Sequence, residues 1–301
     1  MLTEDTQTEN QELIEIINSY VSTNGPNKED YQKLNLSIEK LGQRIVENKI
    51  DKSKLHDLIK QADFLTNKNS IMGHILQKPY GYAGDFSIID RIYTYDFSDQ
   101  FRKWDDYSLT NSAAQAVRNR KTYFKKLVTN RLPGEGKLLN IASGPGRDLF
   151  EYYSENKNTN VLTTCVEIDK EAISHATLLN KEFLSSITFV NKNILLYKAE
   201  SKFDLIWSAG LFDYFDDRQF VFVLKSISRW LQPGGEIVIG NFNQDNNPSR
   251  LYMELFGEWF LNHRTSEQLI NLAEAAGFRR EHISVGREPE NVNLFLHLTY
   301  N

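Results

Sequence analysis

Between residues 137 and 242, five short β-rich runs alternate with helix-like segments, and this alternation leaves few folds open to the chain. The runs are KLLNIAS (137–143), VLTTCVEI (161–168), ITFVNKNI (187–194), FDLIWSAG (203–210) and GEIVIGNF (235–242). Roughly one helix-like segment separates each run from the next, which predicts parallel strands joined by right-handed crossovers. The sequence therefore predicts an α/β fold with a doubly wound sheet.

Two further strand candidates follow, RREHISVG (279–286) and NLFLHLTY (293–300). The proline-containing turn between them is too short for a crossover helix, so the two strands must pair antiparallel. The predicted sheet thus has seven strands, with the last one antiparallel.

Residues 1–130 show helical spacing and few strand signals. Apolar residues recur at i, i+3 and i+4 in LIEIINSYV (13–21), YQKLNLSIEKLGQRIV (31–46) and KLHDLIKQADFL (54–65). We therefore predict a helical N-terminal cap or lid over residues 1–130 and a sheet domain over 131–301. Whether the first helices also form a homodimer contact stays open.

Composition and charge restrict the classes of function. The chain has 301 residues and a formal net charge of −5, without any block of five like charges, and clustered basic residues are what nucleic-acid binding needs. We therefore expect no nucleic-acid partner. Cys165 is the single cysteine, in an apolar run, and the six histidines lack metal-ligand spacing, so we expect no metal. The first residues lack a signal-peptide pattern and no 18-residue apolar run follows, which predicts a cytoplasmic protein without a membrane span.

The segment NIASGPG, residues 140–146, joins the first predicted strand to a helix-like segment. Strand, glycine turn and helix in this order are typical of a ligand site at the carboxyl end of a parallel strand. A dinucleotide fingerprint requires a third small residue, but Leu149 occupies that position. The turn therefore favours a different ligand.

NIASGPG resembles the first motif of class I S-adenosylmethionine-dependent methyltransferases, in which an acidic residue precedes a small-small-Gly-x-Gly run. Asn140 stands at the acidic position and Ala142 at the first glycine. The resemblance implies a Rossmann-like seven-stranded sheet, S-adenosylmethionine as cofactor and S-adenosylhomocysteine as product. It also implies that the turn approaches the amino-acid end of the cofactor, where helix N–H groups favour a carboxylate. The predicted cofactor-binding residues are Asn140, Ala142, Ser143, Gly144, Gly146, Glu167, Ile168, Asn193, Ile194, Ser208, Ala209 and Gly210.

Glu167 ends the second predicted strand, 21 residues after the last glycine of the turn. This spacing suits a carboxylate that accepts both ribose hydroxyls, because a vicinal diol offers two donors to one bidentate acceptor. Asp169 is the alternative ribose ligand, or it caps the next helix. Asn193 and Ile194 follow the third strand, near the expected adenine, and residues 208–210 leave space beside the cofactor.

Four segments resemble a bacterial subgroup of these methyltransferases that makes methyl esters of long-chain 3-hydroxy fatty acids, a cell-density signal. The segments are PYGYAGDF (79–86), AVRNR (116–120), SAGLFDY (208–214) and GNFNQDNNPSRLYMELFGEWFLNHR (240–264). The D/N-P-P-Y tetrapeptide of many nucleic-acid and protein amine methyltransferases is absent after the fourth strand. The resemblance therefore implies a small-molecule acceptor, with a carboxylate oxygen as the first hypothesis.

These segments supply the predicted catalytic and substrate-binding residues. The catalytic predictions are Tyr82, Asp85, Tyr214, His263 and Arg264, and the substrate-binding predictions are Arg118, Phe212, Asp213, Asn243 and Trp259. An ionised carboxylate acceptor needs an orienting donor, which a guanidinium offers, whereas a hydroxyl or amine acceptor needs a group that relays its proton. Structural roles also stay open for these residues. They are a helix cap for Asp85, buried structural contacts for Arg264, packing for His263, and core positions for the aromatic residues.

Arg118 and Arg120 flank a single position, so on a helix their side chains diverge and only one readily faces the site. We predict that Arg118 is the one whose side chain faces the site.

The leading hypothesis is thus an enzyme that methylates a small molecule. Alternatives are N- or O-methylation of another metabolite, transfer of the cofactor's aminocarboxypropyl arm, and a non-catalytic S-adenosylmethionine-binding regulatory protein. The last stays open because Asn140, Ala142 and Asn193 depart from the family pattern.

Overall fold

In the computed structural model, residues 4–50, 53, 57 and 61–299 are described, and the chain divides into two compact units. The helical unit comprises Met1–Gln115 and Pro248–Phe260, and the sheet unit comprises Ala116–Asn247 and Leu261–Asn301. The boundary expected from the sequence, after residue 130, instead leaves residues 116–130 with the helical region and residues 248–260 with the sheet. The role of the helical unit as a cap stays a prediction.

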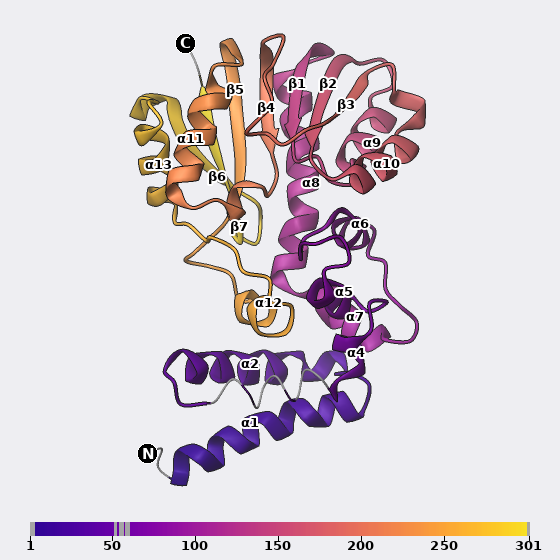
Figure 1. The fold of residues 1–301 in the computed structure, drawn as a ribbon, viewed down its shortest axis with the longest axis vertical. Coiled ribbons are helices and arrows are strands. Elements are labelled where there is room, and N and C mark those ends of the chain that lie inside the picture. Colours follow the sequence, from indigo (N-terminus) through magenta and orange to yellow (C-terminus); the bar gives the residue numbers. More distant parts are fainter. Residues whose placement is uncertain (1–3, 51–52, 54–56, 58–60, 300–301) are drawn as a thin grey trace. The chain divides into compact units, whose positions relative to one another are not determined.

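The sheet unit is built on one seven-stranded sheet with the order β3-β2-β1-β4-β5-β7-β6 (Figure 1). The strands are β1 (Glu135–Ile141), β2 (Asn160–Glu167), β3 (Ile187–Asn191), β4 (Phe203–Ser208), β5 (Leu231–Phe242), β6 (Ile283–Arg287) and β7 (Asn293–Thr299). Strands β1 to β5 pair in parallel, whereas β7 pairs antiparallel with both β5 and β6. The predicted Rossmann-like fold with an antiparallel last strand is confirmed.

Helices cover both faces of this sheet. They are α8 (Ser112–Arg131), α9 (Arg147–Glu155), α10 (Lys170–Leu179), α11 (Asp217–Ser228) and α13 (Ser266–Ala275). Leu138 of β1 lies in a core that contains residues of α8 and α9, and Leu139 lies in a core that contains residues of α11 and α13. Strands buried on both faces have nearly continuous apolar sequences, which explains the runs seen in the sequence.

The helical unit consists mainly of short helices. They are α1 (Glu4–Ser22), α2 (Tyr31–Val46), α4 (Asp63–Thr66), α5 (Ile71–Gln77), α6 (Phe86–Thr94), α7 (Arg102–Thr110) and α12 (Arg250–Phe256). Helix α12 packs against α2, where a Cβ on Gly42 would lie 2.7 Å from the side chain of Leu251. Residues 54–56 and 58–60 of the helix predicted over residues 54–65 lie outside the described residues.

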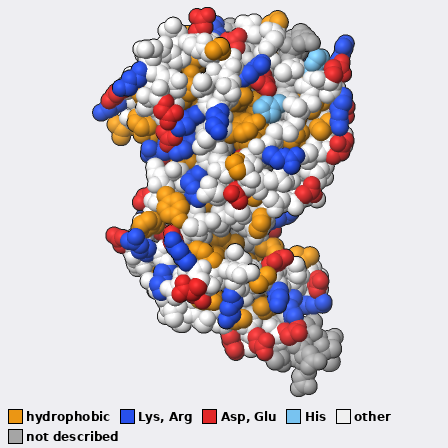
Figure 2. Space-filling view, turned by 180° about the vertical axis from the view of Figure 1, so that it is seen from behind, with side chains coloured by type: hydrophobic (Ala, Val, Ile, Leu, Met, Phe, Trp, Pro, Cys, Tyr) orange, Lys and Arg blue, Asp and Glu red, His pale blue; other side chains and the backbone are white. Residues whose placement is uncertain are grey.

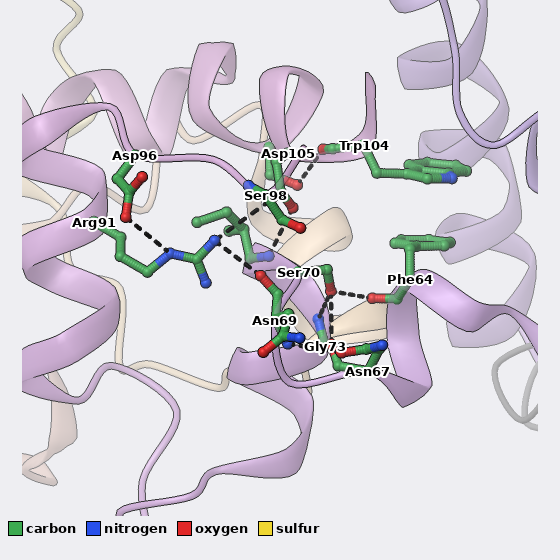
Figure 3. A network of polar contacts seen from close by, with 12 residues as sticks. Phe64, Asn67, Asn69, Ser70, Gly73, Arg91, Asp96, Ser98, Trp104 and Asp105 are labelled. Carbon is green, nitrogen blue, oxygen red and sulfur yellow. Dashed lines mark hydrogen bonds and ion pairs between the residues drawn. The ribbon is translucent and has the colours of Figure 1, made fainter. Parts of the chain in front are cut away.

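A buried polar network joins the helices of this unit (Figure 3). Asp105 on α7 is fully buried and accepts hydrogen bonds from the backbone N–H groups of Ile71 (2.7 Å) and Ser98 (2.8 Å). Arg91 on α6 donates to the same carboxylate at 3.4 Å. Burial raises the pKa of Asp105, and these contacts oppose the rise. The network therefore ties α5, α6 and α7 together through one carboxylate.

The surface carries charges of both signs. Lys and Arg side chains are mixed with Asp and Glu over the face that Figure 2 shows, with hydrophobic side chains between them. Among the described residues, no helix is both long and apolar enough to cross a membrane. Within the same part of the chain, no three His, Cys, Asp or Glu side chains are grouped to hold a metal ion.

Candidate active site

The glycine turn lies between β1 and α9, at the carboxyl end of the parallel strands. Ala142, Gly144 and Gly146 have φ angles of 54°, 55° and 65°, in the left-handed region. Glycine adopts this region freely, whereas an alanine is disfavoured there by roughly 1–2 kcal/mol. A Cβ on Gly146 would also lie 3.1 Å from Ala176 on α10, so this glycine permits close packing. The predicted strand, turn and helix are observed, with Ala142 held in a glycine-like conformation.

Glu167 lies at the end of β2, beside the turn. Its side chain is buried, and its carboxylate accepts backbone N–H groups from Gly144 (3.0 Å), Ile168 (2.8 Å) and Asp169 (3.0 Å). Burial raises the pKa of Glu167, while the three backbone hydrogen bonds oppose the rise. The carboxylate thus connects the end of β2 to the glycine turn.

Asp169, the alternative ribose ligand, caps α10. Its Oδ1 accepts the backbone N–H groups of Glu171 (2.8 Å) and Ala172 (3.4 Å). The helix cap that the sequence left open is therefore observed, and this favours Glu167 as the carboxylate that faces the cofactor.

The loops after β2 and β3 carry exposed apolar side chains. Ile168 is 63% exposed and Leu195 is 50% exposed, although both are large and hydrophobic. Asn193 is half-buried, and its Oδ1 accepts the backbone N–H of Leu195 at 2.9 Å. Ile194 is half-buried beside it. Binding of the adenine by these residues stays a prediction.

The other predicted cofactor residues lie at the ends of β1 and β4. Asn140 and Ser143 are buried, Ala209 and Gly210 are half-buried, and Ser208 donates from Oγ to the carbonyl of Ile141 at 3.3 Å. The structure therefore gathers the predicted cofactor residues along the carboxyl ends of β1 to β4.

Three buried ionisable side chains of the sheet unit interact, because the charge of Arg120 acts on both Asp213 and Asp148. Asp213, in the turn after β4, is 1% exposed and accepts the backbone N–H of Phe242 at 2.7 Å. Burial raises the pKa of Asp213 to about 7 and that of Asp148, in the first turn of α9, to about 6. The charge of the buried Arg120 opposes both rises. A Cβ on Gly210 would lie 2.9 Å from Nη1 of Arg120 and 3.6 Å from Oδ2 of Asp213, so both side chains border this glycine.

Arg120 and Asp148 were not among the predicted site residues. Arg118, which was predicted instead, is half-buried on the same helix. A sequence signal for Arg120 existed, since it stands four residues after Ala116 and four before Phe124, which are both fully buried. A charged residue on a buried helix stripe is a candidate for function.

Arg264 is buried and bonded within the sheet unit. Its Nη1 donates to the carbonyl of Phe212 at 3.1 Å and to Oδ1 of Asn241 at 2.9 Å. Its Nη2 donates to the carbonyl of Phe215 at 2.5 Å and lies 3.0 Å from the carboxylate of Asp217. These contacts favour the structural role for Arg264 over the orientation of a substrate.

Both ring nitrogens of His263 have polar neighbours. Nδ1 lies 3.1 Å from the carbonyl of Leu261, and Nε2 lies 3.0 Å from the amide nitrogen of Asn247. A carbonyl only accepts and an amide nitrogen only donates, so the neutral ring with its proton on Nδ1 fits both contacts. This favours the packed role for His263.

The remaining predicted residues of the sheet unit have different surroundings. Asn243 donates to the carbonyl of Asn291 at 2.9 Å and thereby joins two loops. Phe212 is fully buried in the core with α11 and α13, Arg118 is half-buried, and Tyr214 is 43% exposed. The core position that the sequence left open for the aromatic residues is observed for Phe212.

Tyr82, Asp85 and Trp259 belong to the helical unit. Asp85 is fully buried at the N-cap of α6, where its Oδ1 accepts the backbone N–H of Ile88 at 2.9 Å. Its Oδ2 lies 2.8 Å from Nε2 of His74, a contact that was not predicted. Tyr82 is half-buried and Trp259 is 7% exposed. The cap role that the sequence left open for Asp85 is therefore observed.

We expect Asp85→Ala to destabilise the protein by about 1–3 kcal/mol, because it removes the cap of α6 and the buried partner of His74. Asp85→Asn retains an N-cap acceptor, so it should cost less. Urea unfolding followed by circular dichroism measures both. If Asp85 binds the cofactor's ammonium instead, Asp85→Asn will fold normally and bind S-adenosylhomocysteine more weakly.

Residues 134–277 match the model of a protein family described as a methyltransferase domain. This segment is a methyltransferase domain. It contains β1 to β5, the glycine turn, Glu167 and Asp213. The predicted enzyme class, an S-adenosylmethionine-dependent methyltransferase, is thereby confirmed together with its cofactor. No curated protein matches the sequence.

Solved structures share the fold of this methyltransferase. A possible exported protein from Bordetella parapertussis is 17% identical, with a TM-score of 0.63 over 93% of this chain and 98% of its own. Magnesium protoporphyrin IX methyltransferase from Synechocystis PCC 6803, solved with bound S-adenosylhomocysteine, is 10% identical, with a TM-score of 0.51 over 71% of this chain and 93% of its own. Identities this low show a common fold and do not identify the acceptor.

Proposed function

We propose that this methyltransferase acts on a small molecule and that the acceptor atom is the oxygen of a carboxylate. The observation that supports S-adenosylmethionine as the methyl donor is Glu167, a buried carboxylate bonded to the glycine turn at the end of β2, within a methyltransferase domain. In this arrangement the ribose of S-adenosylmethionine binds Glu167, and its adenine lies on the apolar surface of Ile168 and Leu195.

Methyl transfer is an in-line displacement at the methyl carbon bound to the sulfonium. The acceptor oxygen forms a bond to this carbon, and the sulfur keeps the electron pair of the bond that breaks. Orientation and exclusion of water supply most of the catalysis. A carboxylate acceptor is already ionised near neutral pH, so it needs no base. The four segments that resemble fatty acid ester methyltransferases support this acceptor class.

A hydroxyl or amine acceptor is the second candidate, and Asp213 is the observation that favours it. A general base works best when its pKa is close to the working pH, and burial raises the pKa of Asp213 to about 7. The side chain borders Gly210 at the end of β4, beside the residues predicted for the cofactor. Asp213 is therefore our candidate for the group that takes a proton from such an acceptor.

Transfer of a deuterated methyl group distinguishes these candidates. The protein is incubated with S-adenosylmethionine labelled in its methyl group and with a bacterial metabolite and lipid extract, and Glu167→Ala serves as the control. We expect mass spectrometry to find a small molecule that has gained one trideuteromethyl group, as a methyl ester. A labelled ether or methylamine would support the second candidate, and label found only in protein or nucleic acid would contradict a small-molecule acceptor.

A further inference from the structure

Helices α1 and α2 pack against each other in the helical unit, and a groove with a volume of about 790 Å³ is lined by residues of both helices. We infer that this groove is the contact surface between two copies of the chain, which associate through a two-fold axis. The inference concerns how the protein assembles and does not depend on the proposed function.

The two helices form an antiparallel hairpin. Nη1 of Arg44, near the end of α2, donates to Oδ1 of Asn10, near the start of α1, at 2.6 Å. At the other end of the hairpin, the hydroxyl of Tyr20 donates to Asp30, just before α2, at 3.5 Å. These contacts hold the two helices together along their length, so the groove has a fixed shape.

The floor of the groove is apolar. Leu13 of α1 is buried, Ile16 is half-buried, and Leu36 of α2 is 51% exposed. At 100° per residue, Leu36 lies on the opposite side of α2 from the stripe that is buried within the unit, which consists of Leu34, Ile38, Leu41 and Ile45. The exposed leucine therefore belongs to a second face of α2.

The walls of the groove carry opposite charges. The sequence of α1 has five acidic residues and no basic one, and α1 contributes Glu9 and Glu12 to the groove. Helix α2 contributes Lys33, Lys40 and Arg44. Arg44 is paired with Glu9, whereas the side chains of Glu12, Lys33 and Lys40 form no ion pair within the described part of the chain. The hairpin thus offers charges of both signs to a partner.

A second copy of the chain is complementary to this surface. The lining of the groove has four carboxylates and four basic side chains, so a partner of one charge sign would meet as much repulsion as attraction. In a two-fold interface both chains present the same face, and the acidic wall of each lies against the basic wall of the other. Leu36 of each chain then packs over the apolar floor of its partner.

The size of the surface sets the expected strength of the dimer. The 16 residues of α2 span about 24 Å, and two helices side by side are about 20 Å wide, which gives a face of about 500 Å² per chain. Such an area is near the lower limit for specific interfaces between proteins. We therefore expect a dimer whose dissociation constant is micromolar.

Sedimentation velocity of the full chain over about 1–100 µM measures this association. We expect a species of 34.9 kDa at the lowest concentrations and a species of twice this mass at the highest.

Reversal of the charges tests the two walls. Glu9→Lys/Glu12→Lys reverses the acidic wall, and Lys33→Glu/Lys40→Glu reverses the basic wall. Each variant alone should associate at least about 10-fold more weakly, because like charges then face each other. An equimolar mixture of the two variants should form the dimer again, since the reversed walls complement one another.

Two further variants separate the groove from the rest of the hairpin. Leu36→Ser removes the exposed apolar side chain without a change of charge and should weaken the dimer at least about 10-fold. Glu15→Lys/Glu39→Lys is the matched control, because both residues are exposed on the same helices and lie outside the groove lining. This control should dimerise within about 3-fold of the parent. Circular dichroism shows whether each variant is folded.

A parent protein that stays monomeric over this concentration range would overturn the inference. Failure of the two folded charge-reversal variants to associate when mixed would also overturn it. A dimer that persists in Leu36→Ser and in both charge-reversal variants would have its contact elsewhere, and this result too would contradict the inference. None of these outcomes measures methyl transfer, so the proposed function is tested separately.

Discussion

Glu167→Gln is expected to weaken the binding of S-adenosylhomocysteine by about 10- to 150-fold, which corresponds to about 1.5–3 kcal/mol. The carboxylate of Glu167 accepts three backbone N–H groups, including that of Gly144 in the glycine turn. Glutamine offers one oxygen in place of two and carries no charge. The variant therefore loses the charged acceptor for the ribose hydroxyls, and it also loses part of the hydrogen bonding that holds the glycine turn. Titration calorimetry measures the affinity.

Asp169→Asn is the control for this prediction. Asp169 follows Glu167 by two residues and caps α10, a role that asparagine also fills. The affinity of the Asp169→Asn variant for S-adenosylhomocysteine should stay within about 3-fold of the parent value, which corresponds to a change in binding free energy of about 0.7 kcal/mol. If Asp169→Asn weakens the cofactor and Glu167→Gln does not, Asp169 is the ribose ligand and the assignment of Glu167 is wrong.

The sheet could be predicted from the sequence because its signal is local. Residues Leu138 and Leu139 are both fully buried, on opposite faces of β1, so the strand appears as one apolar run. The packing of Leu251 on α12 against Gly42 on α2 has no such signal, since the two residues are far apart in the chain. The segment 248–260 was therefore assigned to the sheet region by its position in the sequence alone.

The sequence did not determine which of the two side chains, Arg118 or Arg120, is buried in the sheet unit. The side chains of Arg118 and Arg120 point in different directions from α8, and the packing of this helix decides which of them is buried. Ala116, Phe124 and Val128 are fully buried and stand four or eight residues from Arg120, so they place it on the buried stripe of α8. The apolar stripe is visible in the sequence, and a charged residue on such a stripe is rarely buried unless it is paired.

Arg264→Ala is expected to lower the free energy of unfolding by about 3 kcal/mol. The side chain is 3% exposed, and its removal leaves the buried carbonyl of Phe212 and the side-chain oxygen of Asn241 without this donor. The guanidinium also lies 4.9 Å from the ring centre of Phe220, a cation–π contact that is lost with it. Urea unfolding followed by tryptophan fluorescence measures the change.

The Asp217→Asn variant removes the ion pair of Arg264 and leaves its buried hydrogen bonds in place, so it measures the contribution of the ion pair alone. The Asp217 side chain is 76% exposed, so this pair should contribute less than about 1 kcal/mol. If Arg264 orients the acceptor instead, Arg264→Ala will keep the stability of the parent protein and raise KM for the acceptor.

Arg264 also influences the protonation of Asp213. Its charge is one of two that oppose the rise in the pKa of Asp213 caused by burial. Without Arg264 the pKa of Asp213 should rise further, so a folded Arg264 variant should hold a larger fraction of Asp213 in its protonated form near neutral pH.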